Sequence, residues 1–227
     1  MFTNQLAAYP EVAAVNTKTT NFIMLFTEIQ KYIQSFDLDS IPNERKSDLQ
    51  PLIDYLSERI TVDKSIRLNF ICTHNSRRSH LCQIWAQTFA HYFQIKNVFC
   101  YSAGTEATAL FPKITDTLTK VGFQIECVAQ CENPIYSIKY TSNEQPIIGF
   151  SKTLKHQFNP SSEFASIMTC NHADKNCPFI SGAEMRFSLP FEDPKAFDET
   201  PFQAEKYEER SLQIATEFFY VFSQLNF

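Results

Sequence analysis

The sequence predicts an α/β fold in which helices cover both faces of a central four-stranded parallel sheet. Short apolar segments alternate with helical segments from residue 66 onward, which is typical of parallel sheets. Hydrophobic residues make up 44% of the chain and charged residues 20%, close to the average for globular proteins. The length of 227 residues fits one domain of ordinary size with an appendage. Together these observations predict a three-layer α/β/α main domain over residues 65–227, preceded by a helical N-terminal extension over residues 1–64.

The extension reads as two helices. Apolar residues recur at helical spacing in two runs, and a turn over Asp39–Pro42 separates them. Pro42 and Asn43 mark the start of the second helix, because proline fixes φ and asparagine can cap free amides. We expect the extension either to pack on the main domain or to form a homodimer contact. The runs are Phe22, Leu25, Ile29, Tyr32 and Ile33, then Leu49, Leu52, Ile53, Leu56 and Ile60.

The main domain follows as strands and helices in alternation, with one insertion. The insertion, at about 130–159, holds two β-rich pieces, Ile135–Tyr140 and Pro146–Phe150, which predict a hairpin. Gly122 is expected to end the helix before it. The expected strands are Ile66–Ile71, Asn97–Ser102, Phe164–Thr169 and Glu184–Ser188, and the expected helices are Ser79–Phe93, Pro112–Val121 and Gln203–Leu225.

Charge and apolar patterning exclude several classes of partner. The chain has 20 Lys plus Arg against 25 Asp plus Glu, a net charge of -5, so no positive field favours nucleic acid or an anionic membrane. No apolar run approaches the roughly 18 residues that a membrane span needs, and Met1–Pro10 does not resemble a secretory signal. We expect a cytoplasmic protein. Its seven cysteines would then be reduced, and the odd number argues against a disulfide framework.

The candidate site lies where the first strand of the main domain ends. Cys72 closes that strand and Arg78 opens the next helix, six positions later. A loop that runs into a helix N-terminus directs backbone amides and the helix dipole at a bound anion, and the same field favours the thiolate form of Cys72. Arg78 offers a planar fork for two oxygens of a tetrahedral oxyanion, and Ser79 can donate to the sulfur. The expected oxyanion-binding residues are Thr73, His74, Asn75, Ser76, Arg77 and Arg78.

Two further features complete the predicted chemistry. Asp193 precedes Pro194, which presents the carboxylate on a turn, so Asp193 is the candidate general acid for a departing oxygen. Asn75 tolerates the positive φ that such a tight loop often demands. Cys82, Cys100 and Cys127 are expected to be buried apolar residues, and Cys131 has no assigned role.

Four segments in order resemble the low-molecular-weight protein tyrosine phosphatase superfamily, which includes the thioredoxin-coupled arsenate reductases. The resemblance covers about residues 66–225. In the reductases, two more redox cysteines occur with six residues between them, and Cys170 and Cys177 match that spacing together with Ala173, Asp174, Asn176 and Pro178. The four segments are Phe70 to Ser79, Tyr101 to Ala107, Met168 to Pro178, and Asp193-Pro194.

The resemblance implies a three-cysteine relay: Cys72 attacks arsenate, Cys170 displaces arsenite by forming a disulfide with Cys72, and Cys177 resolves that disulfide. A thioredoxin-like reductant is then the expected partner. The rival is a phosphatase for phosphotyrosine or a small phosphate ester, with a phosphocysteine at Cys72 and Asp193 as acid and then base. A third hypothesis is a catalytically silent oxyanion- or phosphoprotein-binding module.

The loop also departs from the family at two positions. His74 stands where glycine is common, and Arg77 where cysteine or an apolar residue is common; Arg77 is expected to add positive charge at the rim of the loop. Gln83 replaces a glutamate that often supports potassium in the reductases, so that site is not carried over. We expect no metal and no cofactor, a zinc site at Cys170, His172 and Cys177 being the weaker rival.

Overall fold

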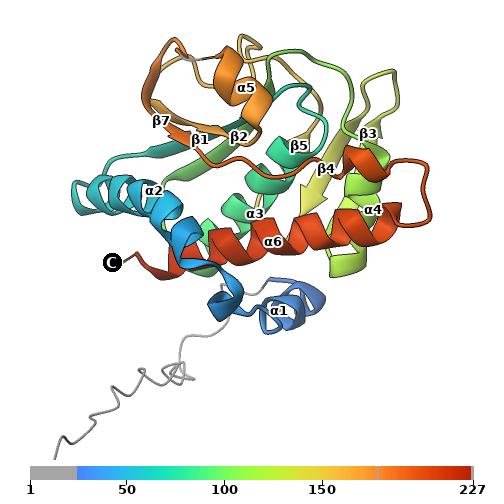
Figure 1. Ribbon diagram of the computed structural model, residues 1–227, viewed down its shortest axis with the longest axis horizontal. Coiled ribbons are helices and arrows are strands. Elements are labelled where there is room, and N and C mark those ends of the chain that lie inside the picture. The colour runs from blue at the N-terminus through green and yellow to red at the C-terminus, as the bar shows by residue number, and fades with distance from the viewer. Residues whose placement is uncertain (1–24, 178, 226–227) are drawn as a thin grey trace, which may run out of the picture.

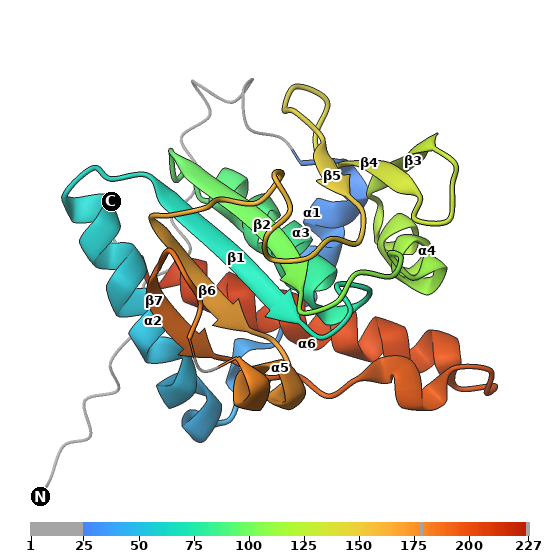
Figure 2. The same cartoon turned by 90° about the horizontal axis from the view of Figure 1, so that it is seen from above.

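A four-stranded parallel sheet forms the centre of the molecule. The computed structural model describes residues 25–177 and 179–225, so the expectations for Met1–Pro10, Phe22 and Pro178 lie outside the described residues. All four strands point the same way in Figure 2. The fold class predicted from the sequence is confirmed. The spatial order is β2 (Val98–Gly104), β1 (Ile66–Cys72), β6 (Phe164–Met168) and β7 (Ala183–Ser188).

Helices cover the sheet unequally. Helices α2 (Asn43–Thr61), α3 (Arg78–Tyr92) and α6 (Gln203–Ser223) lie along one face, and the short α5 (Asn171–Asn176) lies on the other (Figure 1). On the first face an aromatic core joins the layers. Trp85 and Phe89 are fully buried and stack with their ring centroids 5.5 Å apart. Offset stacking of large rings adds directional stability to the apolar burial.

The N-terminal helices pack into the same core. Helix α1 (Thr27–Ile33) places Tyr32 against Trp85, and the 3₁₀ turn Leu38–Ser40 precedes α2. Pro42 is the residue that caps α2, without a side-chain hydrogen bond, so the capping expected of Asn43 is wrong. Pro42 sets φ at -58°, which orients the chain for the helix without a side-chain acceptor.

The insertion is a second sheet beside β2. Strands β3 (Gln124–Ala129), β4 (Ile135–Lys139) and β5 (Ile147–Gly149) pair antiparallel in that order. The expected hairpin is β4–β5, and β3 extends it by a strand that the sequence analysis missed. β3 is an edge strand of six residues whose side chains are largely exposed, and its polar–apolar alternation covers only the four residues Gln124–Cys127, which is a short signal.

The remaining elements lie close to their expected positions. Helix α4 (Pro112–Val121) ends at Gly122, whose φ of 113° is the left-handed conformation expected of a helix-ending glycine. Two short helices were not expected, α5 and the 3₁₀ turn Pro194–Phe197. Across residues 25–177 and 179–225, every helix is too short or too polar to cross a membrane.

Candidate active site

The candidate residues gather at the carboxyl ends of the parallel strands, where ligands bind in sheets of this kind. Cys72 is the last residue of β1 and lies opposite Gly104, the last residue of β2. β6 leads to Thr169 and Cys170, and the segment after β7 reaches Asp193. Three stretches that are 20 to 100 residues apart in the sequence therefore border the loop of residues 73–77.

The loop turns its carbonyl groups outward. Thr105 N–H donates to the Cys72 carbonyl at 3.2 Å, and Phe111 N–H donates to the Ser76 carbonyl at 3.0 Å. The His74 carbonyl accepts from Ser151 Oγ at 2.8 Å. By contrast, the backbone N–H groups of residues 73–79 donate to no acceptor in the described part of the chain. Successive free amides at a helix N-terminus form a concave anion-binding site.

Gly104 allows the loop to lie this close to β2. A Cβ at this position would lie 2.7 Å from the Thr73 carbonyl oxygen and 2.7 Å from the Asn75 amide nitrogen. Both distances are shorter than real Cβ contacts, and both partners are backbone atoms that cannot rotate away. Glycine is therefore required here by close approach of two backbones.

Cys72 is buried and belongs to a short hydrogen-bonded chain. Its Sγ lies 3.1 Å from Ser79 Oγ, and Asn75 Nδ2 donates to the same hydroxyl at 2.9 Å. Because Asn75 occupies one acceptor position of Ser79, the Ser79 proton is free to point at the sulfur, where it stabilises a thiolate. Asn75 has φ of 44°, the positive value expected from its place in the loop.

Arg78 and Asp193 meet across the loop. Arg78 Nη2 donates to Asp193 Oδ2 at 2.5 Å, and Nη1 donates to the Phe191 carbonyl at 2.9 Å. Its buried Nε has no partner among residues 25–177 and 179–225. Asp193 Oδ1 accepts from the Lys195 amide, which fixes the carboxylate on its turn. The arrangement holds a candidate acid beside a guanidinium that can receive an oxyanion.

A second buried thiol lies beside the loop. Cys170 Sγ is 3.6 Å from Thr73 Oγ1, and Thr73 directly follows Cys72. Cys170 caps α5 by accepting from the Ala173 amide at 3.3 Å, which directs partial positive charge at the sulfur. Cys72 and Cys170 belong to one buried apolar cluster, and the half-buried Cys177 packs against it. All three are free thiols.

Cys177 stands at the opposite end of α5. This helix is six residues long and is held to β7 by Arg186, which bonds Asp174 Oδ1 at 2.6 Å and the Cys177 carbonyl at 3.2 Å. So short a helix contributes little stability of its own. Hydrogen bonds from the Arg186 side chain therefore hold this helix against β7.

His74 and Arg77, the two loop positions at which the sequence departs from the pattern it resembles, differ in their exposure to solvent. The His74 ring is half exposed and lies 3.6 Å from the Glu106 carboxylate. Arg77 does not lie at the rim: its guanidinium is largely buried, pairs with Asp198 at 2.6 Å and covers the Phe111 ring. The expected rim charge is therefore wrong, because this side chain is neutralised inside the protein.

Two of the remaining cysteines are buried and two are exposed. Burial raises the pKa of Cys82 and of Cys100, which keeps both thiols protonated. Cys127 lies exposed on the edge strand β3, so its expected burial is wrong, and Cys131 is also exposed. In the ranges 25–177 and 179–225, no group of three or more His, Cys, Asp or Glu side chains lies close enough to hold a metal.

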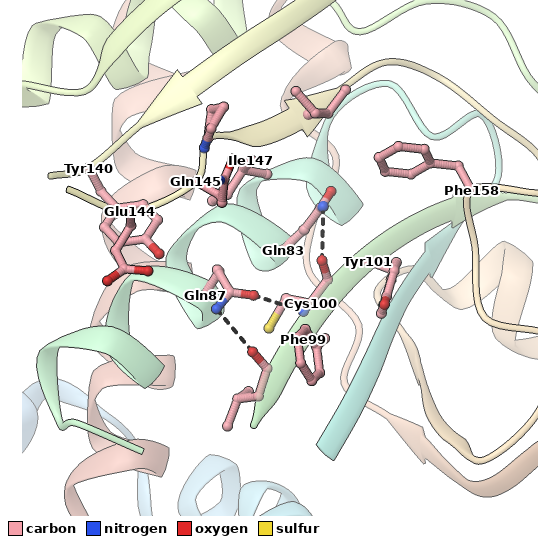
Figure 3. Close-up of a pocket in the computed structure, with 13 residues that line it drawn as sticks. Gln83, Gln87, Phe99, Cys100, Tyr101, Tyr140, Glu144, Gln145, Ile147 and Phe158 are labelled. Carbon is pink, nitrogen blue, oxygen red and sulfur yellow. Dashed lines mark hydrogen bonds between the residues drawn. The ribbon is translucent and has the colours of Figure 1, made fainter. Parts of the chain in front are cut away.

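A separate pocket opens between β2 and the inserted sheet (Figure 3). Gln83 and Gln87 of α3 fix its floor: Gln83 Nε2 donates to the Cys100 carbonyl and Gln87 Oε1 accepts from the Cys100 amide. Phe99 and Tyr140 contribute aromatic walls. None of the candidate catalytic residues lines it, so this pocket is distinct from the loop.

The sequence analysis missed three polar residues behind the loop. His80 bonds the Asn75 carbonyl through Nε2 at 3.0 Å, and Ser102 Oγ lies 3.3 Å from His80 Nδ1. Lys152 Nζ donates to Ser102 Oγ at 3.3 Å. Ser102 stands within one of the segments used for the resemblance, but Lys152 comes from the insertion, and no spacing links it to residue 72.

The comparisons with known proteins found arsenate reductases by sequence, and low-molecular-weight protein tyrosine phosphatases and an arsenate reductase among solved structures. No protein-family model matches the chain. "Arsenate reductase 2" and "Arsenate reductase", from two strains of Staphylococcus epidermidis, are each 27% identical over 135 residues, which cover 59% of this chain and 82% of the relative. These relatives are enzymes.

Solved structures with a similar chain path include a low-molecular-weight protein tyrosine phosphatase from T. tengcongensis, at 16% identity and a TM-score of 0.49 over 71% of this chain and 100% of that chain. Another is described as an arsenate reductase in the reduced state, at 16% identity and a TM-score of 0.45 over 71% of this chain and 99% of that chain.

Proposed function

We propose that this chain is a thiol-dependent arsenate reductase of the low-molecular-weight protein tyrosine phosphatase superfamily. The observation that carries the proposal is the second buried thiol beside the loop: Cys170 Sγ lies 3.6 Å from Thr73 Oγ1 in the same apolar cluster as Cys72. A phosphatase needs the nucleophile alone, whereas a reductase needs two thiols to supply two electrons.

The proposed first step uses the loop as an oxyanion site. Arsenate sits on the free amides of residues 73–79, and Arg78 leaves Asp193 to bind two of its oxygens. The Cys72 thiolate attacks arsenic and displaces one oxygen as water, with Asp193 protonating the oxygen that leaves. The product is a covalent adduct of Cys72 sulfur with pentavalent arsenic.

The second step reduces arsenic. The Cys170 thiolate attacks the Cys72 sulfur, a disulfide forms, and the electron pair of the sulfur–arsenic bond leaves with arsenic as arsenite. Two thiols are thereby oxidised and arsenic gains two electrons. Cys177 then attacks Cys170, which frees Cys72 and leaves a disulfide at the two ends of α5. A thioredoxin-like dithiol reduces that disulfide and supplies the two electrons.

The proposed setting follows from the thiol chemistry. Free thiols persist where glutathione and thioredoxin keep them reduced, so we place the protein in the cytoplasm. A homodimer through the N-terminal helices finds less support, because the apolar residues of α1 and α2 are buried in the chain's own core. We therefore expect a monomer in solution, measurable by light scattering.

The second candidate function is hydrolysis of phosphotyrosine or a small phosphate ester. The hydrogen bond between Asp193 and Arg78 favours it, because it places an acid beside the guanidinium that would hold a phosphoryl group. In this reaction Cys72 forms a phosphocysteine and water, activated by Asp193, releases phosphate.

Replacing Cys170 separates the two functions. Cys170→Ser is expected to abolish thioredoxin-coupled arsenate turnover while leaving p-nitrophenyl phosphate hydrolysis within about threefold of wild type, since only the reductase uses the second thiol. Cys127→Ser, which alters an exposed thiol on the edge strand β3, is the matched control and is expected to leave both rates unchanged.

Each other outcome has a defined meaning. Arsenate turnover that survives in Cys170→Ser overturns the relay. Wild-type protein that hydrolyses the ester without reducing arsenate is a phosphatase. Binding of phosphate with neither reaction identifies a silent oxyanion-binding module.

A further inference from the structure

One buried cation lies behind the loop and takes no part in the proposed reaction. Lys152 is only 1% exposed. Its Nζ donates to Ser102 Oγ and to the Phe150 carbonyl, each at 3.3 Å, and it lies 4.6 Å from the centre of the Phe150 ring. No carboxylate in the described ranges lies within ion-pair distance of it.

A lysine in this position costs stability. Burying an ammonium group without an acidic partner is among the most expensive substitutions a core can carry. An apolar side chain of similar length would fill the same space without that cost. Residues that cost stability and are nonetheless present tend to occur where function requires them.

The hydrogen bonds of Lys152 lead directly to the loop. The Asn75 carbonyl can only accept, so His80 Nε2, at 3.0 Å from it, must carry a proton and donate. Burial and then the nearby Lys152 lower the pKa of His80, which keeps the ring neutral, so its Nδ1 is an acceptor. Ser102 then donates to His80 Nδ1 and accepts from Lys152 Nζ.

Lys152 also holds the loop through its backbone. Its N–H donates to Asn75 Oδ1 at 2.9 Å, and its carbonyl accepts from the Gly104 amide at 2.8 Å. Asn75 therefore has its carbonyl, its side-chain oxygen and its side-chain nitrogen all bound, the last to Ser79. These bonds hold Asn75 at positive φ, and Ser79 in contact with the Cys72 sulfur.

We propose that Lys152 is a positioning residue for the oxyanion loop: its ammonium group fixes the direction of the hydrogen bonds through Ser102 and His80 to Asn75, and so aligns the loop amides and the Ser79–Cys72 contact. This inference rests on the proposed use of the loop by an oxyanion, and it holds for arsenate or phosphate alike. Lys152 lies between β5 and β6, within the insertion of residues 130–159, so the insertion supplies this positioning residue.

Lys152→Met tests the inference, with Lys155→Met as the matched control. Methionine keeps the length and apolar stem but removes the donor, whereas Lys155 is exposed three residues further on. We expect Lys152→Met to weaken binding of inorganic phosphate about tenfold and to raise the pH midpoint of Cys72 alkylation by iodoacetamide by about one unit. Lys155→Met is expected to match wild type in both.

Two further measurements separate positioning from simple stability. Nitrogen-15 NMR of wild-type protein is expected to show the His80 proton on Nε2 and a hydrogen-bonded Nδ1, and Lys152→Met is expected to weaken the hydrogen bond at Nδ1. Ser102→Ala breaks the same chain with Lys152 in place and is expected to give the same loss of phosphate binding. The double variant should bind phosphate no more weakly than either single variant, because both substitutions interrupt the same series of hydrogen bonds.

The inference fails if Lys152→Met or Ser102→Ala folds, keeps its phosphate affinity within about twofold of wild type and keeps its alkylation midpoint within about 0.3 pH unit of wild type. It fails equally if His80 carries its proton on Nδ1 in the wild-type protein. The proposed function fails on a separate result, the absence of arsenate turnover in wild-type protein that binds phosphate normally.

Discussion

At the scale of single residues, the site depends on the direction of neighbouring side chains. Arg77 and Arg78 are adjacent, yet one points into the core toward Asp198 and the other across the loop toward Asp193. Arg77 precedes α3 with φ of -131°, whereas Arg78 is the first residue of the helix. Because the backbone conformation changes between them, the Arg77 guanidinium serves the structure of the protein and the Arg78 guanidinium can bind substrate.

Paired substitutions at these two arginines are expected to give opposite effects. Arg78→Met should weaken phosphate binding by at least about a hundredfold, because it removes the bidentate donor from the loop. Arg77→Met should leave the phosphate Kd within about threefold and lower the free energy of unfolding by about 1–3 kcal/mol, because it breaks a largely buried ion pair. Titration calorimetry and urea unfolding measure the two effects, and equal losses of binding would contradict this assignment.

At the scale of elements, β1 carries both the nucleophile and a polar residue that the fold does not use. Asn69 is fully buried between Leu68 and Phe70, and neither its side-chain nitrogen nor its oxygen has a partner among residues 25–177 and 179–225. The apolar residues Ile66, Leu68 and Phe70 predict β1 from the sequence, but no pattern in the strand shows that the Asn69 amide is left unpaired.

Asn69→Leu is therefore expected to stabilise the protein. Removing a buried amide that bonds nothing recovers its desolvation cost, so the free energy of unfolding should rise by about 1 kcal/mol or more in urea unfolding. Asn69→Asp keeps the shape but adds a charge and is expected to destabilise. Loss of stability in Asn69→Leu would show that the amide has a polar partner.

At the scale of the whole molecule, the insertion places a buried amino group, that of Lys152, against Ser102 of the main domain. Burial lowers the pKa of Lys152 from 10.5 to about 7. The groups that face it are neutral, namely Ser102, His80 and the rings of Phe150 and Phe158. Between pH 7 and about 10.5 the unfolded chain binds a proton that the folded protein lacks, so this group makes stability rise with pH over that interval.

The pH dependence of stability is expected to change when Lys152 is replaced. Below pH 7 the buried lysine is charged and its cost is fully present, so Lys152→Met should exceed wild type in free energy of unfolding most clearly at pH 6. The difference should shrink by a few kcal/mol, at ~1.4 kcal/mol per pKa unit, as the pH rises toward 10. Lys155→Met serves as the control, and a difference independent of pH would contradict the shift.

The sequence by itself determined the order of the strands and long helices of the main domain, the strand–loop–helix around Cys72 and the end of a helix at Gly122, because these follow from local pattern and backbone conformation. It also identified Asp193, Cys170 and Cys177 as candidates, through short motifs. The tertiary structure alone decided which side chains face the loop. Arg77 turns inward, Cys127 lies exposed on an edge strand and Lys152 reaches the loop from an insertion. Those outcomes depend on contacts between segments far apart in the sequence, which no local periodicity encodes.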